Sequence, residues 1–537
     1  MKKLPIAVQT FAEIRDDQHL YVDKTEHMHN MLQGSKANFL SRPRRFGKSL
    51  LLDTFKELFE GNRKLFQGLY IEDKWDWSQT YPVIKLDFAD GTLQSREALD
   101  LRIRKMLQDC ADQLGVSIPH SIHYSTQQQA NDIPGCFRDL IVACHKKYAQ
   151  KVVILIDEYD KPILDNIEQP EQAAQMREGL KNLYSVMKGQ DAYIQFVFMT
   201  GVTKFSKVSL FSGINQIQDL TLHTKYATIC GYTEQDLKTE FAGHLQGVDW
   251  EQLKEWYNGY QFSGQAVYNP YDILLFIDGG CRFKNYWFET GSPSFLLKLF
   301  KQRQYFLPDL EAIEVGEDIL DSFDVERINP ITLLFQAGYL TLNNCYETDF
   351  GELVYQLKVP NREVRSALNT HFIGAYAEIE SAAMQWRQEI FRLLSTGDLA
   401  RLQQQIKALF AGIPWRNFNQ NDLPDSEGYY ASVLYAFFAS LNATIIPEDI
   451  SCHGQADMTV ILGDFIYVIE FKRDTSNEYQ PQMPNPALEQ IQSRQYSAKY
   501  LTANQAAEAG KHIFEVGMIF NTHARNLVQM DWVEVNA

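Results

Sequence analysis

Four short apolar runs, rich in β-branched and aromatic residues, occur in the first 200 residues, and stretches with helical periodicity separate them. They span residues 37–40, 82–86, 152–156 and 194–199. Apolar strands of this kind are typically buried on both faces, and strands that alternate with helices pair in parallel. The sequence therefore predicts an α/β fold in which helices cover both faces of a parallel sheet.

The length of the chain requires more than this one sheet. A chain of 537 residues exceeds what a single hydrophobic core supports, so we expect two or three domains. Hydrophobic residues make up 45% of the chain and charged residues 22%, which excludes disordered and fibrous classes. Every domain should therefore bury a core of its own.

The expected compartment of the protein and the redox state of its cysteines follow from motifs that the sequence lacks. Polar and charged residues interrupt the start of the chain, and no apolar run is long enough to span a bilayer, so we expect neither a signal peptide nor a membrane segment. Seven cysteines lie scattered between Cys110 and Cys452 without the short paired spacing of zinc sites or disulfide frameworks. These features favour a reducing cytoplasm.

The net charge of −17 bears on nucleic-acid binding. Non-specific affinity for nucleic acids comes mainly from neutralising phosphates, so the surface as a whole is not expected to bind them. A local basic groove remains compatible with this charge.

Residues 39–50 (Phe-Leu-Ser-Arg-Pro-Arg-Arg-Phe-Gly-Lys-Ser-Leu) predict the end of a strand, a loop and the start of a helix. A loop that ends in Gly47-Lys48-Ser49 at a helix N-terminus presents backbone N–H groups and the positive end of the helix dipole to phosphates. We expect Lys48 to reach the β and γ phosphates of ATP and Ser49 to bind Mg²⁺. Arg42 stands where such loops usually begin with glycine.

The buried run 152–156 ends in two carboxylates, Asp157 and Glu158, as Walker B strands do. Asp157 is expected to hold Mg²⁺ together with Ser49 and water, and Glu158 to polarise the attacking water as a base. The alternative interpretation is an interior strand whose charges merely emerge at its solvent end. The order of loop and strand along the chain favours the nucleotide site.

Polar residues follow the next strand. Thr200 could sense the γ-phosphate, but Thr200 and Thr203 could equally cap the end of the strand. Basic residues could neutralise phosphate charge in the same chain or toward a neighbouring subunit, or could simply be solvated; these are Arg42, Arg44 and Arg45. Oligomerisation is therefore left open.

Three segments together resemble the bacterial AAA-ATPase-like family: residues 21–25 (Tyr-Val-Asp-Lys-Thr), 41–50 and 157–160 (Asp-Glu-Tyr-Asp). Residues 256–260, 268–270 and 359–361 extend the resemblance, which covers nearly the whole chain. The resemblance implies that Arg42 is normal for the loop. It also implies that a PD-(D/E)XK nuclease-like domain commonly follows the ATPase module.

The middle of the chain predicts a helix and a hairpin at residues 333–342 and 353–360, which looks like a winged helix, and then a helical spacer. We expect a P-loop sheet with a helical and winged-helix lid, followed by a restriction-endonuclease-like α/β domain. The predicted domains are 1–245 (ATPase-like), 246–365 (helical and winged-helix-like), 366–415 (spacer) and 416–537 (nuclease-like).

Two carboxylates and a lysine lie on neighbouring strands of the last domain. Asp457 begins one strand, and the next runs from residue 465 to 472 after a short turn. Alternation along a strand puts Glu470 and Lys472 on one face. Asp457 and Glu470 could share Mg²⁺ or Mn²⁺ while Lys472 orients the nucleophile or stabilises charge, although such a pair also occurs on strands by chance.

The predicted order of elements reproduces the αβββαβ order of PD-(D/E)XK domains. These elements are a helix near 428–441, three strands from 443 to 471, a helix at 486–500 and a strand at 513–520. This resemblance implies that Glu427 is an additional acidic residue of the site and that Gln490 is the glutamine that follows the core. Gln492 and Tyr496 offer a competing alignment, and both glutamines could equally be surface positions.

The sequence thus predicts an ATP-binding and ATP-hydrolysing module that controls a Mg²⁺-dependent nuclease acting on DNA, with RNA left open as a substrate. The alternative is a nucleotide-switched interaction protein, or a nucleic-acid-binding protein, whose nuclease fold does not cut. The intact set of Asp457, Glu470 and Lys472 favours the enzyme.

Overall fold

The computed structural model describes residues 1–118, 132–205, 217–287, 300, 305, 307–311, 313–321, 328–377, 383–413, 427–481, 483–507 and 510–535. Contacts within the chain divide it into two compact units. Unit 1 contains residues 1–286 and 315–355, and unit 2 contains residues 287–314 and 356–537. In the described part of the chain, no helix has both the length and the apolarity needed to cross a membrane.

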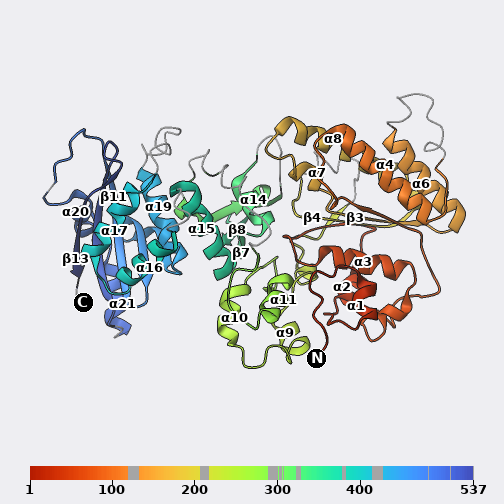
Figure 1. Cartoon of the computed structure of the whole chain (residues 1–537), viewed down its shortest axis with the longest axis horizontal. Helices are drawn as coiled ribbons and strands as arrows, with labels where there is room; N and C mark the ends of the chain where they lie inside the picture. Colours follow the sequence, from red (N-terminus) through yellow and green to blue (C-terminus); the bar gives the residue numbers. More distant parts are fainter. Residues whose placement is uncertain are drawn as a thin grey trace. The chain divides into compact units, whose positions relative to one another are not determined.

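Unit 1 is built on a five-stranded sheet with the order β2-β3-β4-β1-β5, and all its neighbouring strands run parallel (Figure 1). The strands are β1 (Ala37–Ser41), β2 (Val83–Asp87), β3 (Val152–Asp157), β4 (Ile194–Gly201) and β5 (Gln218–Asp219). All six residues of β3 are buried, as its uninterrupted apolar sequence requires. The four strands predicted from the sequence are confirmed, and β5 adds a short edge.

Helices cover both faces of this sheet (Figure 1). The first face carries α1 (Phe11–Asp16), α2 (Thr25–Leu32) and α3 (Lys48–Phe59). The second carries α4 (Arg96–Gln113), α6 (Ile133–Tyr148), α7 (Lys161–Leu164) and α8 (Pro170–Gly189). Short 3₁₀ turns lie at η1 (Arg63–Phe66), η3 (Asp191–Tyr193) and η4 (Thr224–Tyr226). The three-layer α/β class predicted from the sequence is confirmed.

A second hydrophobic core of unit 1 lies among α9 (Glu234–Glu240), α10 (Trp250–Tyr257) and α11 (Pro270–Asp278). Side-chain caps define where these helices begin: Thr233 and Asp236 form a capping box on α9, and Asn269 caps α11 ahead of Pro270. Leu20 and Val22 of the N-terminal segment are buried in the same core. The start of the chain is thereby fixed to the helices that follow the sheet.

The predicted helix and hairpin are present. Helix α14 (Pro330–Ala337) ends at Gly338, whose φ of +88° lies in the left-handed region that glycine adopts easily. Strands β7 (Thr341–Glu347) and β8 (Leu353–Lys358) follow, and with β6 (Ile313–Gly316) they form a sheet with the order β6-β8-β7. Helix α13 (Glu317–Asp321) connects β6 toward α14.

Unit 2 contains a mixed five-stranded sheet with the order β13-β12-β11-β10-β9, in which only the β11–β12 pair is parallel. Its strands are β9 (Thr444–Ser451), β10 (Gly454–Leu462), β11 (Phe465–Asp474), β12 (His512–Asn521) and β13 (Asn526–Val535). Its helical elements are η6 (Leu307–Glu311), α15 (Arg362–Ala377), α16 (Ala383–Leu394), α17 (Leu399–Ala411), α19 (Glu427–Ser440), α20 (Pro486–Ser493) and α21 (Ala498–Ala507). Phe520 packs on Phe410 and Tyr430, from α17 and α19.

The helices and strands at the end of unit 2 differ from the predicted elements in two places. The predicted single helix 486–500 is two helices, because Gln495 turns the chain with a φ of +49° between α20 and α21. Strand β13 was not predicted. The helices predicted as a spacer belong to unit 2, where α15 packs on α19 and α17 packs on β13. The contacts define two units, whereas the sequence predicts four domains; the four-domain division remains a prediction.

Candidate nucleotide and nuclease sites

The loop between β1 and α3, the β1–α3 loop, ends at the N-terminus of a twelve-residue helix. Gly47 precedes the helix with a φ of +88°, and Arg45 adopts +68°. Backbone N–H groups in the first turn of a helix have no partner within the helix, so they and the helix dipole attract anions. The structure places Lys48 and Ser49 at this anion-attracting end, as the sequence predicts.

The ammonium group of Lys48 lies inside this loop. It donates hydrogen bonds of 3.0 Å to the carbonyl oxygens of both Arg42 and Pro43, and the residue is 7% exposed. Burial lowers the pKa of Lys48, while the carboxylates of Asp157 and Asp160 act in the opposite direction. Two carbonyl oxygens are weaker partners than phosphate oxygens, so the ammonium can exchange them for an anion that enters the loop.

The carboxyl ends of β3 and β4 lie at one edge of the sheet, and β4 lies between β1 and β3. The Thr200 hydroxyl donates to Asp157 Oδ1 at 3.1 Å, and the backbone N–H of Glu158 donates to the same oxygen at 3.0 Å. Asp157 is 2% exposed. The strand order thus brings Asp157 and Thr200 beside the loop that holds Lys48.

Glu158 follows β3 with a φ of +48°, a left-handed conformation that is unfavourable for a residue with a side chain. The residue is half-buried, and burial, followed by the charge of Asp157, raises the pKa of Glu158. A carboxylate with a raised pKa accepts a proton more readily, which is what a general base requires.

Asp160 and Thr203 fasten the chain after β4 to the chain after β3. Asp160 Oδ2 accepts hydrogen bonds from the Val202 N–H at 3.0 Å and from both the N–H and the hydroxyl of Thr203 at 2.6 Å. The Thr203 hydroxyl therefore has a structural partner, in keeping with the capping alternative. The Thr200 hydroxyl instead contacts the Walker B carboxylate.

Arg42 is directed away from Lys48. Its guanidinium donates to the carbonyl oxygens of Thr221 at 2.7 Å and Tyr226 at 3.1 Å and lies 4.0 Å from the ring centroid of Phe262. Burial lowers the pKa of Arg42 to about 10, so the group stays charged at neutral pH. These contacts give Arg42 a role in bracing the β1–α3 loop.

Arg45 lies 4.0 Å from the ring centroid of Tyr271, in α11. The neighbouring Phe46 packs edge-on against Tyr260 at 4.8 Å between ring centroids. The loop therefore packs its large side chains on α11 and on the segment between α10 and α11. For Arg42 and Arg45, contact with phosphate stays a prediction.

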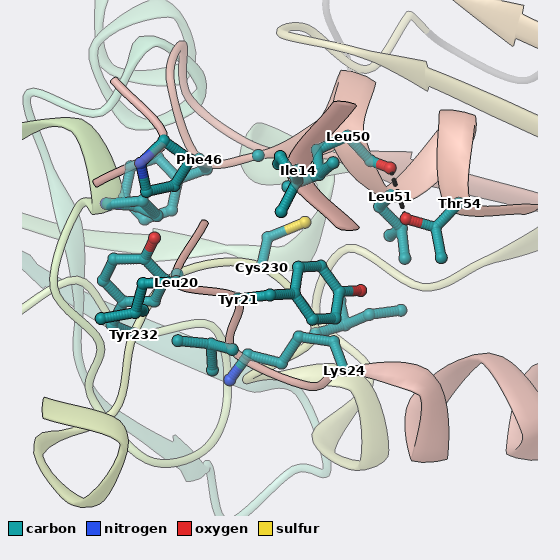
Figure 2. A pocket seen from close by; sticks show the side chains of 16 residues that line it. Ile14, Leu20, Tyr21, Lys24, Phe46, Leu50, Leu51, Thr54, Cys230 and Tyr232 are labelled. Carbon is teal, nitrogen blue, oxygen red and sulfur yellow. Dashed lines mark hydrogen bonds between the residues drawn. The ribbon is translucent and has the colours of Figure 1, made fainter. Parts of the chain in front are cut away.

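A hollow of about 540 Å³, part of it open to solvent, lies beside the first turn of α3 (Figure 2). Its walls come from the N-terminal segment, from the β1–α3 loop and α3, and from the chain around Tyr232. The lining residues are Pro5, Ile14, Leu20, Tyr21, Val22, Lys24, Phe46, Gly47, Leu50, Leu51, Thr54, Ile229, Cys230, Gly231, Tyr232 and Pro270. A mostly apolar hollow with two tyrosines next to an anion site suits a planar ring attached to phosphates. Sequence reasoning did not predict this pocket.

The segment 21–25, which carries the family resemblance, holds one wall of this pocket. Asp23 Oδ1 accepts from the N–H and hydroxyl of Thr25 at 2.8 and 2.7 Å, and Asp23 Oδ2 accepts from the Tyr70 N–H at 2.7 Å. Lys24 pairs with Asp236 at 2.8 Å. The motif itself was the signal that could have indicated the pocket.

In unit 2 the structure brings Asp457, Glu470 and Lys472 together. The β10–β11 register, continued by one residue from the Met458–Ile469 pair, sets Asp457 opposite Glu470, so both side chains lie on one face. Asp457 Oδ2 accepts from the Phe471 N–H at 2.7 Å, and Lys472 Nζ lies 3.1 Å from Glu470 Oε1.

Gln490 joins this group from α20. Its side-chain amide donates to Glu470 Oε1 and lies 3.4 Å from the hydroxyl of Tyr496, whereas Gln492 is exposed. Of the two glutamine alignments, the structure places Gln490 at the carboxylates. The side chain of Glu427, at the start of α19, lies outside the described residues.

Glu470 has one oxygen without a partner. The residue is 2% exposed, and among the described residues no group donates a hydrogen bond to its Oε2. Burial, followed by the charge of Asp457, raises the pKa of Glu470 to about 7, and Lys472 opposes this shift. A buried carboxylate oxygen without a donor, next to a second carboxylate, suits a hard divalent cation such as Mg²⁺ or Mn²⁺.

Few protein oxygens are available to a metal ion at either candidate site. In the described residues, no group of three or more His, Cys, Asp or Glu side chains is arranged to hold a metal ion. Mg²⁺ commonly binds through one or two carboxylates together with water and substrate phosphates. Asp157 with Ser49, and Asp457 with Glu470, fit that pattern.

Gly517 lets α20 lie directly on the sheet. It pairs with Glu470 in the β11–β12 register, and a Cβ atom there would lie 2.4 Å from the backbone nitrogen of Leu488. Asn485 caps α20 and donates to Asp531 Oδ2 at 2.9 Å and to the Gly517 carbonyl at 3.2 Å. This close approach brings Gln490, two residues after Leu488, to Glu470.

Two family models match the chain. Residues 5–211 match a family described as predicted AAA-ATPase, and residues 425–530 match the PD-(D/E)XK nuclease superfamily. A protein of Azotobacter chroococcum mcd 1, described as an uncharacterized protein in the vnfD 5' region, is 41% identical over 528 residues, which is 98% of each chain. No solved structure matches. The chain belongs to the family of AAA-ATPase-like proteins that carry a C-terminal PD-(D/E)XK nuclease-superfamily domain.

Gly517→Ala tests how α20 is positioned. The added methyl should push α20 off β12, lower the free energy of unfolding by about 1–3 kcal/mol, and weaken Mn²⁺ binding because Gln490 leaves Glu470. Urea unfolding and calorimetric Mn²⁺ titration measure the two effects. Gly189→Ala, where a Cβ meets no atom within 4 Å, is the control. Unchanged Mn²⁺ affinity in Gly517→Ala would show that α20 does not position the carboxylates.

Proposed function

We propose that this protein is a nuclease controlled by ATP: unit 1 binds and hydrolyses ATP with Mg²⁺, and unit 2 cleaves DNA with a divalent metal. The observation that carries the proposal is the buried oxygen Oε2 of Glu470, which accepts no hydrogen bond from the described residues. Glu470 lies on the same face of the sheet as Asp457, and its other oxygen, Oε1, contacts Lys472 and Gln490. A binding module that does not cut has no need to bury an unsatisfied carboxylate oxygen.

In the ATP half, phosphates would enter the β1–α3 loop and take over the Lys48 ammonium from the carbonyls of Arg42 and Pro43. Asp157, held by Thr200, and Ser49 would hold the Mg²⁺ that neutralises charge on the phosphates. Glu158, with its raised pKa, would take the proton of the attacking water. The hollow beside α3 would receive the base.

In the nuclease half, Asp457 and Glu470 would hold the metal, which supplies activation of water and stabilisation of charge on the phosphorus. Gln490 and Lys472 hold Glu470 Oε1 and so leave Oε2 for the metal. The Lys472 side chain is 36% exposed, so its ammonium group can also stabilise negative charge on the phosphate in the transition state.

The proposed substrate is DNA, with RNA as the alternative that the experiment decides. The net charge of −17 confines nucleic-acid contact to a local surface. All seven cysteines are free thiols, which supports a cytoplasmic location.

Lys48→Ala should weaken ATP binding at least about tenfold, because a charge-assisted contact to phosphate is lost. Calorimetric titration of MgATP measures this. Lys56→Ala, about two turns further along the same helix and paired with Glu57 and Glu60, should leave the affinity unchanged. Equal affinity of wild type and Lys48→Ala would remove the loop from the ATP site.

Glu158→Gln should bind MgATP normally and hydrolyse it about a hundredfold or more slowly, since an amide cannot act as a base. Phosphate release under saturating ATP gives the rate. Glu178→Gln on the exposed face of α8 serves as the matched control. Normal turnover in Glu158→Gln would transfer the base role to another group such as Asp160.

Asp457→Asn and Glu470→Gln should each lose Mn²⁺ binding and cleavage, whereas Lys472→Ala should keep Mn²⁺ and lose cleavage. The carboxylates hold the metal, and the lysine stabilises charge. Calorimetry reports the metal, and plasmid and single-stranded substrates, each with and without ATP, report cleavage. Asp464→Asn, an exposed position of the same hairpin, is the control. A wild type that binds no metal and cuts neither DNA nor RNA under any nucleotide condition would favour the nucleotide-switched interaction protein.

A further inference from the structure

Among the described residues of the winged-helix-like part, neither α14 nor the tip of the β7–β8 hairpin presents a face suited to reading DNA. All residues of α14 from Pro330 to Gln336 are buried, so this helix cannot enter a groove. The tip of the β7–β8 hairpin is acidic, with exposed Glu347, Asp349 and Glu352, and would repel phosphates. The side-chain contacts of α14 indicate a different role for this helix.

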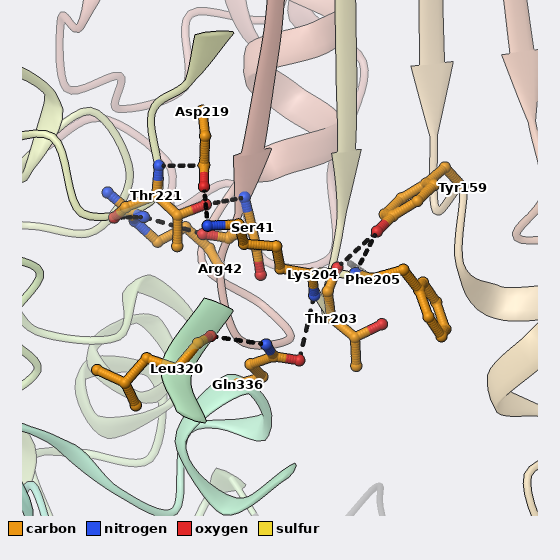
Figure 3. A network of polar contacts seen from close by, with 10 residues as sticks. All are labelled: Ser41, Arg42, Tyr159, Thr203, Lys204, Phe205, Asp219, Thr221, Leu320 and Gln336. Atoms are coloured by element: carbon orange, nitrogen blue, oxygen red, sulfur yellow. Dashed lines mark hydrogen bonds and ion pairs between the residues drawn. The ribbon is translucent and has the colours of Figure 1, made fainter. Parts of the chain in front are cut away.

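Gln336, on α14, contacts the chain that leaves the proposed ATP site. Its side-chain oxygen accepts from the Lys204 backbone N–H at 3.1 Å, and its side-chain nitrogen donates to the Leu320 carbonyl at 3.3 Å (Figure 3). The residue is 5% exposed. Both ends of the amide are therefore occupied by backbone groups of two different segments.

The segment that Gln336 holds is tied on its other side to the residues after the Walker B strand. The Tyr159 hydroxyl donates to the Thr203 carbonyl at 2.9 Å and accepts from the Phe205 N–H at 3.2 Å (Figure 3). Asp160 holds the Thr203 N–H and hydroxyl. Since Glu158 directly precedes these residues, the position of its carboxylate depends on the same contacts.

The network also reaches the β1–α3 loop. Lys204 Nζ forms an ion pair with Asp219, and Asp219 Oδ1 accepts from the Thr221 N–H at 2.9 Å. Thr221 in turn accepts from the Ser41 N–H at 3.1 Å and from the Arg42 guanidinium at 2.7 Å. One connected set of buried polar contacts thus links α14, the end of β4 and the loop that holds Lys48.

We propose that Gln336 is a positioning residue for ATP hydrolysis, which fixes the segment after β4 and through Tyr159 and Asp160 orients Glu158. The proposal rests on the proposed ATPase function and adds α14 to the hydrolysing machinery. Gln336 bonds the Lys204 backbone directly, reaches the β1–α3 loop less directly through Lys204, Asp219 and Thr221, and does not line the hollow beside α3. Its loss should therefore reduce turnover and spare nucleotide binding.

Gln336→Met, which keeps the length of the side chain and removes both hydrogen bonds, tests the proposal. We expect the ATP turnover number to fall about tenfold to a hundredfold, the range that misplacement of a catalytic group produces, with MgATP affinity within about twofold of wild type. Faster hydrogen exchange of the Lys204 and Phe205 amides should accompany the loss. Gln336→Glu, which retains an oxygen for the Lys204 N–H, should turn over faster than Gln336→Met.

Thr332→Val is the matched control, because the Thr332 hydroxyl donates to the Ile319 carbonyl at 2.6 Å from the same buried helix without touching the end of β4. It should lower stability and leave turnover unchanged. If Gln336→Met hydrolyses ATP at the wild-type rate, or no more slowly than Thr332→Val, the positioning role is wrong. A wild type that does not bind MgATP would instead overturn the proposed ATPase function, and this proposal with it.

Discussion

A buried guanidinium at the position where phosphate-binding loops usually begin with glycine holds the proposed ATP site together. Arg42 is 1% exposed and donates to the carbonyls of Ser41, Thr221 and Tyr226. Because its side chain faces away from the loop interior, its own carbonyl remains available to Lys48. The loop therefore does not need a glycine at this position. The large side chain of Arg42 instead anchors the loop to the strand edge and to Phe262 of the following helical region.

Both candidate sites use the same physical arrangement. In unit 1, Lys48 lies among the carboxylates at the ends of parallel strands, and in unit 2, Lys472 lies against Glu470 on the sheet. Burial raises the pKa of Glu158 and of Glu470, so each carboxylate binds a proton or a cation more readily than it would in water. At each site a lysine offsets part of the cost of placing such a carboxylate in a poorly solvated position, and the proposed cation would offset more of it.

The sequence predicted what depends on local patterns. Short apolar runs located β1, β3 and β4. The Gly-Lys-Ser and Asp-Glu motifs located the two sides of the proposed nucleotide site, because strand ends meet at one edge of a parallel sheet. Alternation along β11 put Glu470 and Lys472 on one face, and the structure agrees. These features require no knowledge of distant contacts.

Features that arise from distant contacts were missed. The Arg42 side chain faces away from the loop interior because of contacts to Thr221, Tyr226 and Phe262, about 180 to 220 residues later. The amide of Gln336 acts on Lys204 across 132 residues. The packing of the predicted spacer helices on unit 2 is of the same kind. The break between α20 and α21 needs a left-handed Gln495, a conformation that residue type does not indicate.

The most direct test of this account is a crystal structure of the chain with Mg²⁺ and a non-hydrolysable ATP analogue. The account predicts that Lys48 Nζ leaves the carbonyls of Arg42 and Pro43 for phosphate oxygens, while the Arg42 guanidinium keeps its contacts to Thr221 and Tyr226 and the base occupies the hollow lined by Tyr21 and Tyr232. An analogue bound elsewhere, or an Arg42 side chain turned onto the phosphates, would contradict it.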